Sequence, residues 1–223
     1  MPVWPADVLV LAAFEPELSP LWKALGQHGD GRVGRLAVSG RVCGVGLATA
    51  TAGAAAHIAA AGARVAVAVG TCGAYAGSGI PVGAVVVARR VVLADWGGML
   101  GAAQSPDAVH PPWVTHAAVS RGLVSGGARP VDVATTLGVT VDDAAAARIE
   151  RATGAHAEHM EAYGFAAACG GAGVAFTAVL GVANVVGSEG RAQWRSNHEA
   201  TSAAAIAHIV RWLEAGAPGI PPR

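Results

Sequence analysis

Short apolar runs alternate with amphipathic or alanine-rich stretches along this chain. Strands are predicted over residues 8–13, 64–69, 83–92, 131–136 and 176–183, and residues 8–13 form a continuous apolar run of strand length. Helical patterns predict helices near residues 20–25, 47–61, 142–151, 162–169 and 197–214. Strands that are apolar on both faces and alternate with helices are typical of an α/β sheet with helices on both faces.

Glycines mark several of the predicted turns. A hairpin is predicted around Ser39-Gly40, between strands at residues 33–38 and 41–45. Gly62 is expected to end the helix over residues 47–61 in a left-handed conformation. The segment Gly70-Thr71-Cys72-Gly73 is predicted to be a turn in which the backbone can approach a ligand closely.

Composition narrows the class of protein. The 223 residues are 53% hydrophobic and 13% charged, which is enough to bury one domain, predicted over residues 1–215 and followed by a Pro-rich tail at residues 216–223. Fifteen Lys and Arg balance fifteen Asp and Glu, and no basic run occurs. Because a phosphate backbone needs clustered positive charge, nucleic acid is not an expected partner.

Cysteine spacing and charge placement bear on location. Cys43, Cys72 and Cys169 lie far apart without a Cys-x-x-Cys spacing, which suits buried thiols in a reducing compartment. Residues 65–88 carry no charge, but five glycines, a serine and a proline divide them into strand, turn and strand. The first apolar run contains acids and has no basic region before it, so no secretion signal is predicted. These features predict a cytoplasmic protein with no membrane partner.

Two carboxylates, Glu158 and Glu161, stand just before the apolar helix predicted over residues 162–169. Their spacing of three residues predicts neighbouring positions in a helical turn. A structural alternative is that the positive end of the helix dipole favours acids there. Further polar residues, Glu17, Thr71 and Asn184, follow or end predicted strands, where ligands of α/β folds gather. Together these residues favour a binding site.

A metal site is the first alternative for this segment. His156 and His159 are three residues apart and could share a metal ion if both were helical. However, the His-Glu-x-x-His spacing is absent, no Cys ligand is near, and His156 is assigned to a strand before the helix. We therefore expect neither a metal nor another cofactor.

Four motifs in sequence order carry a resemblance to a known family. They are Ala-Ala-Phe-Glu-Pro-Glu-Leu at residues 12–18, Val-Gly-Thr-Cys-Gly-Ala at residues 69–74, Met160-Glu161 before a helix, and a strand that ends in Asn184. Over about residues 8–213 the chain resembles the purine nucleoside phosphorylase and methylthioadenosine nucleosidase superfamily. That resemblance implies a single-domain, three-layer α/β/α fold with a central twisted mixed sheet.

Within that superfamily, one branch matches best. Residues 94–97, 158–161 and 184–187, followed by Arg191 and Trp194, resemble the futalosine hydrolases, which release hypoxanthine from futalosine in an alternative menaquinone pathway. The resemblance implies a small purine nucleoside as substrate. It also implies a homo-oligomer, since relatives complete their pockets with a neighbouring subunit, and the long loop at residues 93–112 is the expected contact.

The resemblance assigns roles to individual residues. Glu161 would accept hydrogen bonds from the ribose 2′ and 3′ hydroxyls and oppose the developing positive charge, and Met160 would pack against the sugar. Glu17 would be the general base for an attacking water, the alternative being an acid that stabilises the first turn of a helix. The remaining implied substrate contacts are Thr71, Cys72, Gly73, Val141 and Arg191. Arg191 would face the benzoate of futalosine, with Trp96 or Trp113 beside it, although a surface role for Arg191 is equally compatible with the sequence.

Asn184 bears on the choice of base. Adenine-specific relatives have an Asp at the matching position, which can protonate N7 of the purine. An Asn has no titratable proton, but its amide can donate to N7 or pair with a 6-oxo edge, so hypoxanthine is favoured over adenine. The structural alternative is an Asn in a turn after a strand. Ala183 departs from relatives that often have Ser.

Three alternative functions stay open. A phosphorylase needs cations for phosphate, but Ala68 stands where similar phosphorylases have Arg, and Glu15-Pro16-Glu17 would repel an anion. An adenine-specific nucleosidase for methylthioadenosine or aminodeoxyfutalosine is disfavoured by Asn184. A non-catalytic nucleoside-binding protein would bind without turnover.

Overall fold

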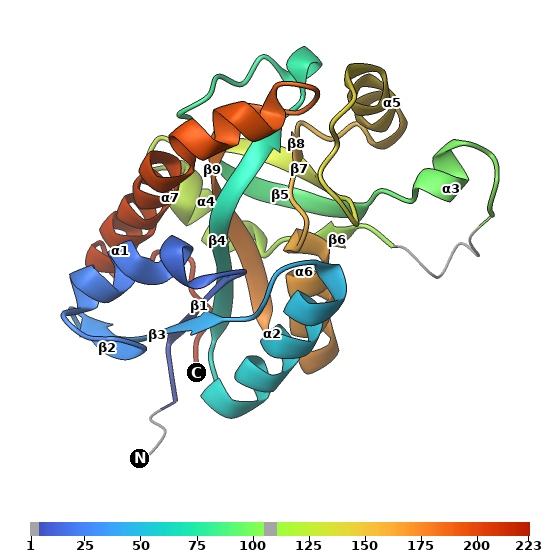
Figure 1. Ribbon diagram of the computed structural model, residues 1–223. Helices are drawn as coiled ribbons and strands as arrows, with labels where there is room; N and C mark the ends of the chain where they lie inside the picture. Colours follow the sequence, from blue (N-terminus) through green and yellow to red (C-terminus); the bar gives the residue numbers. More distant parts are fainter. Residues whose placement is uncertain (1–4, 105–110) are drawn as a thin grey trace.

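The fold is a mixed β-sheet with helices on both faces (Figure 1). The computed structural model describes residues 5–104 and 111–223. The strands are β1 (Val8–Ala12), β2 (Asp30–Val33), β3 (Leu36–Val42), β4 (Val65–Ala74), β5 (Val85–Leu93), β6 (Trp113–Val114), β7 (Arg129–Thr135), β8 (Ala157–Glu158) and β9 (Ala175–Val185). The helices are α1 (Glu15–Leu25), α2 (Leu47–Ala61), α3 (Trp96–Met99), α4 (Ala117–Val124), α5 (Asp143–Thr153), α6 (Ala162–Ala172) and α7 (Gly190–Glu214), with one 3₁₀ turn, η1 (Ala76–Ser78).

The sheet closes on itself in its central part. Its strand order is β2-β3-β1-β4-β8-β7-β5-β6, and β9 pairs in parallel with β4 and antiparallel with β5. Strands β4, β8, β7, β5 and β9 therefore form a ring. The register between β4 and β9 shifts at Cys72/Gly73, close to where both strands end. A bulge of this kind bends a strand and redirects its side chains, and this end of the ring carries the candidate site.

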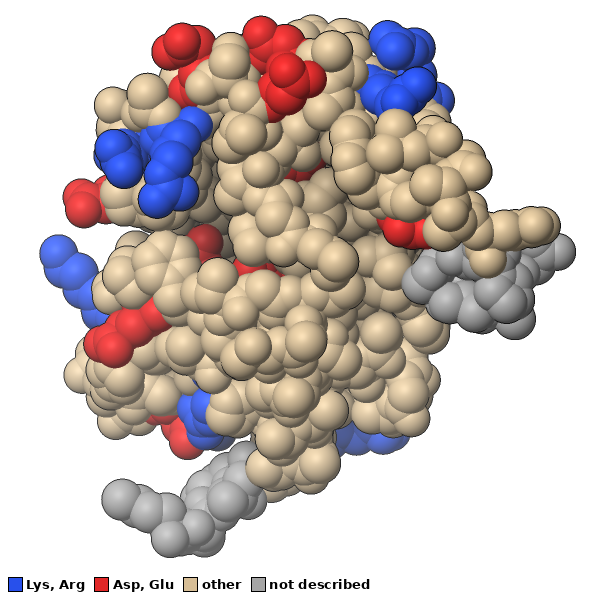
Figure 2. Space-filling model, turned by 45° about the vertical axis from the view of Figure 1, so that its right-hand side comes forward, with Lys and Arg blue, Asp and Glu red and all other residues tan. Residues whose placement is uncertain are grey.

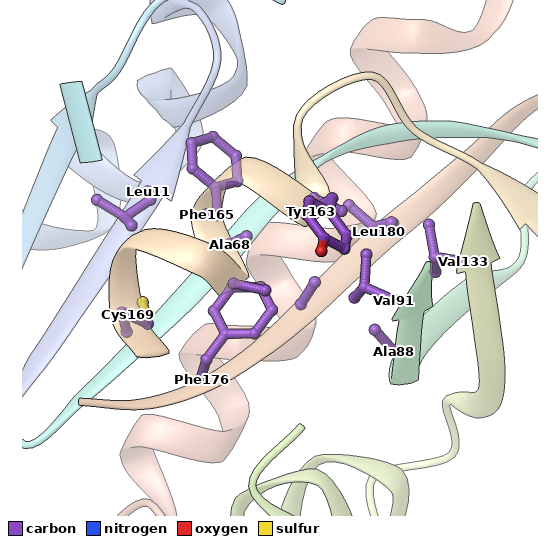
Figure 3. Close-up of a cluster of buried hydrophobic side chains, with 14 of the residues drawn as sticks. Leu11, Ala68, Ala88, Val91, Val133, Tyr163, Phe165, Cys169, Phe176 and Leu180 are labelled. Carbon is purple, nitrogen blue, oxygen red and sulfur yellow. The ribbon is translucent and has the colours of Figure 1, made fainter. Parts of the chain in front are cut away.

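Burial on both faces of the sheet confirms the layered α/β architecture expected from the apolar runs. In β1, Leu9 and Leu11 pack on one side with α2 and α6, whereas Val8 and Val10 pack on the other with α1, α4 and α7. Figure 3 shows Phe165 and Cys169 of α6 packed over Leu11, Ala68 and other strand residues on the first side. All three cysteines are buried and free.

The predicted hairpin turn was wrong in its position. The turn lies at residues 34–35, where Gly34 has a φ of +57°, and β2 pairs with β3 from Val33↔Leu36 to Asp30↔Ser39. Ser39 and Gly40 lie inside β3. The Ser39 hydroxyl donates to Oδ1 of Asp30 at 2.6 Å, and a side chain at Gly40 would collide with Trp22. These two residues therefore serve cross-strand bonding and close packing rather than a turn.

The glycine-flanked segment at residues 70–73 is also not a turn. It continues β4, where Thr71 pairs with Gly181 of β9. Gly70 does permit a close approach to the backbone, but the group that approaches is the side chain of Glu17 and not a ligand. A Cβ at Gly70 would lie 2.7 Å from Oε1 of Glu17.

Two helices begin earlier than the sequence indicates, and two others were not predicted. α1 begins at Glu15 with a proline in its first turn, which suits the preset φ of proline. α7 begins at Gly190 rather than near Asn197, because the Asn197 amide donates to the carbonyls of Ala183 and Gln193 instead of capping a helix. α4 was missed, and the loop predicted at residues 93–112 contains α3, with residues 105–110 outside the described part.

Charge is sparse on much of the surface. On the face shown in Figure 2, the Lys and Arg side chains lie in separate places around the edge, and most of the surface carries no charge. Within residues 5–104 and 111–223, no helix combines the length and the apolar character that a bilayer crossing requires.

Candidate active site

A cavity of about 310 Å³ opens where β4 and β9 end and α1 and α7 begin. Its volume is within the range of small-molecule sites. The residues that line it are Ala13, Phe14, Glu17, Val45, Thr71, Cys72, Gly73, Val139, Thr140, Glu158, His159, Met160, Glu161, Asn184, Val186, Gly190, Arg191 and Trp194. Of the catalytic and substrate-binding residues named from the sequence, Glu17, Thr71, Cys72, Gly73, Met160, Glu161, Asn184 and Arg191 line this cavity. Val141, Trp96 and Trp113 do not line it.

Glu17 lies in the first turn of α1 and is only 3% exposed. Its Oε1 accepts a hydrogen bond of 3.0 Å from the backbone N–H of Thr71, and its Oε2 is buried without a partner among the described residues. Burial raises the pKa of Glu17 to about 8; the Thr71 bond opposes this rise, and the charge of Glu161 adds to it. A carboxyl with a pKa near neutrality and an unpaired oxygen is suited to proton transfer.

Glu161 immediately precedes α6 and is 5% exposed. Its Oε1 accepts from the backbone N–H of Gly46 at 2.8 Å, which fixes the carboxylate from the loop before α2. Gly46 has a φ of +85°, a conformation that glycine adopts readily. The sequence offered no sign of this contact, which spans 115 residues of chain.

His159 supports the turn into α6. Its Nδ1 accepts from the backbone N–H groups of Glu161 and Ala162, both at 3.1 Å, so this nitrogen carries no proton. Burial lowers the pKa of His159, although the nearby Glu161 opposes the shift. The 3.4 Å approach of Nδ1 to Oε2 of Glu161 is therefore not an ion pair.

The two histidines weighed as metal ligands are not placed for one. His156 Nδ1 accepts from the backbone N–H of Asp132 at 3.2 Å, and His159 is committed to α6 as described. Within the described residues, no group of three or more His, Cys, Asp or Glu side chains is arranged to hold a metal ion.

Trp194 joins the wall of the cavity from α7. Its indole N–H donates to Oγ1 of Thr71 at 3.0 Å, and its ring stacks on His198 with centroids 4.2 Å apart. Thr71 thus contacts Glu17 through its backbone and Trp194 through its side chain. Cys72 is buried beside it, and burial raises the pKa of its thiol to about 12. The thiol is therefore not a nucleophile at neutral pH.

Asn184 and Arg191 occupy the side of the cavity nearest to α7. The Asn184 amide nitrogen donates to the carbonyl of Val185 at 2.9 Å, and the side chain is 8% exposed. Gly190 leaves room for this amide, since a Cβ there would lie 3.0 Å from Nδ2. Arg191 is exposed at the cavity rim.

The predicted helical pairing of Glu158 with Glu161 was wrong. Glu158 belongs to β8, which pairs with β4 and β7, so the two acids do not share a helical turn. The Glu158 carboxylate accepts from the Thr140 backbone N–H at 3.0 Å, from the Thr140 hydroxyl at 2.7 Å and from the Tyr75 hydroxyl at 3.0 Å. No sequence pattern pointed to these contacts.

Val141 lies outside the cavity. It is 62% exposed and lines a second cavity of about 570 Å³ between residues 136–142, α3 and α5. Trp96 lines that second cavity as well, whereas Trp113 packs toward Gly170 of α6. Val139 and Thr140 line both cavities, so the segment that contains them is their common wall.

Known proteins resemble this chain in sequence. The model of the phosphorylase superfamily matches residues 9–215. A futalosine hydrolase from Streptomyces coelicolor is 38% identical over 126 residues, which cover 52% of this chain and 52% of that protein. The match therefore spans about half the length of this curated relative.

Solved structures share the fold. A native futalosine hydrolase of Helicobacter pylori superposes with a TM-score of 0.84 at 13% identity and covers 95% of this chain and 98% of its own. A 5′-methylthioadenosine/S-adenosylhomocysteine nucleosidase from Colwellia psychrerythraea, in complex with adenine, gives a TM-score of 0.85 at 17% identity over 100% of both chains. Identities this low support the fold alone, which agrees with the nucleoside phosphorylase-like architecture expected from the sequence.

Proposed function

The chain belongs to the phosphorylase superfamily, and from this premise we propose that it is a nucleosidase that hydrolyses the N-glycosidic bond of a 6-oxopurine nucleoside. Futalosine is the proposed substrate, with menaquinone synthesis as the pathway. The observation that carries the proposal is the pairing of two buried carboxyls, Glu17 and Glu161, in one cavity, with burial raising the pKa of the first to about 8. The Streptomyces coelicolor relative supports the choice of substrate.

The two carboxyls suit the two halves of the reaction. Cleavage of an N-glycosidic bond builds positive charge on the ribose as the base departs with the bonding electrons. Glu161, held by Gly46, is the proposed acceptor for the sugar hydroxyls and the countercharge for that cation. Glu17, whose Oε2 has no partner among the described residues, is the proposed base that takes a proton from the attacking water.

The charges around the cavity favour water over phosphate as the nucleophile. Of the described residues that line it, three are glutamates, and Arg191 is the one with a fixed positive charge. A buried phosphate dianion requires several cationic or N–H donors to offset its desolvation. Hydrolysis is therefore proposed rather than phosphorolysis.

Asn184 and Arg191 are the proposed determinants of substrate choice. The Asn184 amide can donate to N7 or pair with a 6-oxo edge without a titratable proton. Arg191, exposed at the rim, is the proposed partner for the carboxylate of futalosine. Inosine lacks that carboxylate, so futalosine should be the better substrate.

We also propose that the protein is active as a homo-oligomer. Large exposed apolar side chains gather around the second cavity, namely Trp96, Leu137, Val139 and Val141. Exposed apolar patches of this kind mark interaction surfaces, and this one borders the wall of the candidate site. Light scattering should give a multiple of the chain mass, whereas a monomer that keeps full activity at nanomolar concentration would contradict this part.

A substrate panel tests the function. The purified protein is incubated with futalosine, inosine, methylthioadenosine and aminodeoxyfutalosine, with and without phosphate, and the released bases are quantified by chromatography. We expect hypoxanthine from futalosine without phosphate. Release that requires phosphate would indicate a phosphorylase, and release of adenine alone would indicate an adenine-specific nucleosidase. Binding without turnover would leave a nucleoside-binding protein.

A further inference from the structure

Glu158 is a buried carboxylate that the proposed chemistry does not use. It is 7% exposed and accepts three hydrogen bonds, two from Thr140 and one from Tyr75. Hydrogen bonds to an ionised carboxylate are among the strongest in proteins. Burying a carboxylate costs free energy unless hydrogen bonds replace its contacts with water, so these three hydrogen bonds are what makes its burial possible.

One side of this contact is rigid. Glu158 pairs with Gly73 of β4 and with Ala134 of β7, so its backbone is held between two strands of the closed ring. Tyr75, directly after β4, is 1% exposed and gives the carboxylate its third hydrogen bond. The carboxylate is therefore a fixed point next to the cavity.

The other side of the contact, residues 136–141, is a segment with few hydrogen bonds and no regular secondary structure. Residues 136–141 connect β7 to the N-cap of α5 without regular structure, and Leu137 and Val139 are 76% and 49% exposed. Among the described residues, the hydrogen bonds that hold this segment are the two from Thr140 to Glu158. The same segment supplies Val139 and Thr140 to both cavities.

We propose that Glu158 is a positioning residue that anchors residues 136–141 through Thr140 and so fixes the wall between the two cavities. Its kinetic consequence rests on the proposed function. Glu17 and Glu161 are held by other contacts, from Thr71 and Gly46, so loss of Glu158 leaves them in place. The wall, however, shapes the space that the substrate fills. Glu158 therefore acts on substrate binding rather than on the chemical step.

Hydrogen exchange followed by mass spectrometry tests the anchor without any substrate. In Glu158→Ala, amides in peptides that cover residues 136–141 should exchange at least about tenfold faster, because local opening no longer breaks a bond to a carboxylate. Peptides from β4 and β9 should be unchanged. Glu158→Gln should preserve most of the protection, since its amide oxygen can still accept from the Thr140 N–H. Unaltered exchange in Glu158→Ala would overturn the proposal.

Kinetics separate positioning from catalysis. We expect Glu158→Ala to raise KM roughly tenfold while kcat changes by less than about threefold, and Glu158→Gln to restore KM. The matched control is Glu150→Ala on α5, where a carboxylate that also accepts a backbone N–H lies outside both cavities. A loss of kcat at unchanged KM would assign Glu158 to the chemistry and overturn its positioning role.

Two further outcomes remain decisive. If Glu158→Ala fails to fold, Glu158→Met takes its place, because it fills a similar volume but has no oxygen to accept from the backbone N–H or the hydroxyl of Thr140. Unchanged exchange and unchanged KM in that variant would refute the anchor. If the wild-type protein turns over no nucleoside, the proposed function fails, and the exchange experiment alone decides whether Glu158 anchors the segment.

Discussion

The backbone N–H of Thr71 donates a 3.0 Å hydrogen bond to Oε1 of Glu17, which lies 54 residues earlier in the chain. Because this bond occupies Oε1 as an acceptor, the proton of a neutral Glu17 resides on Oε2, the oxygen without a partner among the described residues. In the proposed reaction, this contact between β4 and α1 would therefore make Oε2 the atom through which Glu17 exchanges a proton.

Replacement of Glu17 by Gln should abolish most of the activity. The amide keeps the shape and can still accept from Thr71, but it cannot take a proton from water. We expect kcat to fall by about 10²- to 10⁴-fold, the usual contribution of a general base. Turnover is measured as base release, and circular dichroism checks the fold. The control is Glu15→Gln, two residues earlier in the same first turn but exposed; if both variants stay active, the site is misplaced.

The pH dependence of the wild-type enzyme should report Glu17. Its pKa is raised to about 8, so the carboxyl of the free protein is mostly protonated at pH 7 and becomes a base only as pH rises. We expect kcat/KM to climb with pH and to level off above about pH 8. Initial rates between pH 5.5 and 9.5, within the range where the fold persists, give the profile. A profile that falls over this range would assign Glu17 the role of an acid.

The same pKa shift should reduce stability at high pH. Below the ordinary value of 4.5 both folded and unfolded chains hold the proton, whereas between 4.5 and about 8 the folded state holds more protons than the unfolded state. Stability is therefore lost as pH rises through this window. Glu17→Gln should be more stable than wild type by up to about 5 kcal/mol at pH 9 and nearly equal at pH 4. Urea denaturation at both pH values measures the difference; an equal gap at both would show that ionisation is not its cause.

Glu161→Gln should affect both the rate and the titration of Glu17. Loss of the countercharge to the ribose cation should lower kcat by about 10²- to 10³-fold. Because the charge of Glu161 raises the pKa of Glu17, its removal should also move the midpoint of the pH profile to lower pH. The residual activity is followed across the same pH range. An unmoved midpoint would mean that the two carboxyls are not coupled.

Much of the fold was predictable because burial on two faces leaves a direct trace in the sequence. β1 reads as an uninterrupted apolar run since Leu9 and Val10 face opposite layers, both fully buried. The helix over residues 47–61 ends at Gly62, as expected, because that glycine adopts a φ of +55°. Boundaries were harder, since polar residues such as Asn197 bond to a neighbouring strand rather than to the end of their own helix.

The candidate site was predictable only in part. Glu17, Glu161 and Asn184 were identified through motifs that keep their order along the chain, and all three line the cavity. Thr140 was missed because it lies in a segment without periodicity. Its hydrogen bond to Glu158 joins residues 18 apart in the chain, which the pairing of β7 with β8 brings together. Val141 lines the second cavity only, whereas its neighbours Val139 and Thr140 line both cavities.

Asn184→Asp should change which base is released. In the wild type, the Asn184 amide donates one N–H to the carbonyl of Val185 at 2.9 Å. It has no titratable proton that it could transfer to a departing purine. An Asp can carry that proton to N7, which helps a 6-aminopurine to leave, while repulsion between its ionised form and the 6-oxo group disfavours hypoxanthine. We expect the ratio of kcat/KM values for hypoxanthine and adenine nucleosides to shift toward adenine by at least about tenfold. The ratio is measured with inosine and adenosine in one competition assay, because both substrates then meet the same sample of protein and any unfolded fraction affects the two rates equally. Ser196→Asp, at an exposed position of α7 outside the cavity, is the control for an added charge. An unchanged ratio in Asn184→Asp would contradict the role of Asn184 in base choice.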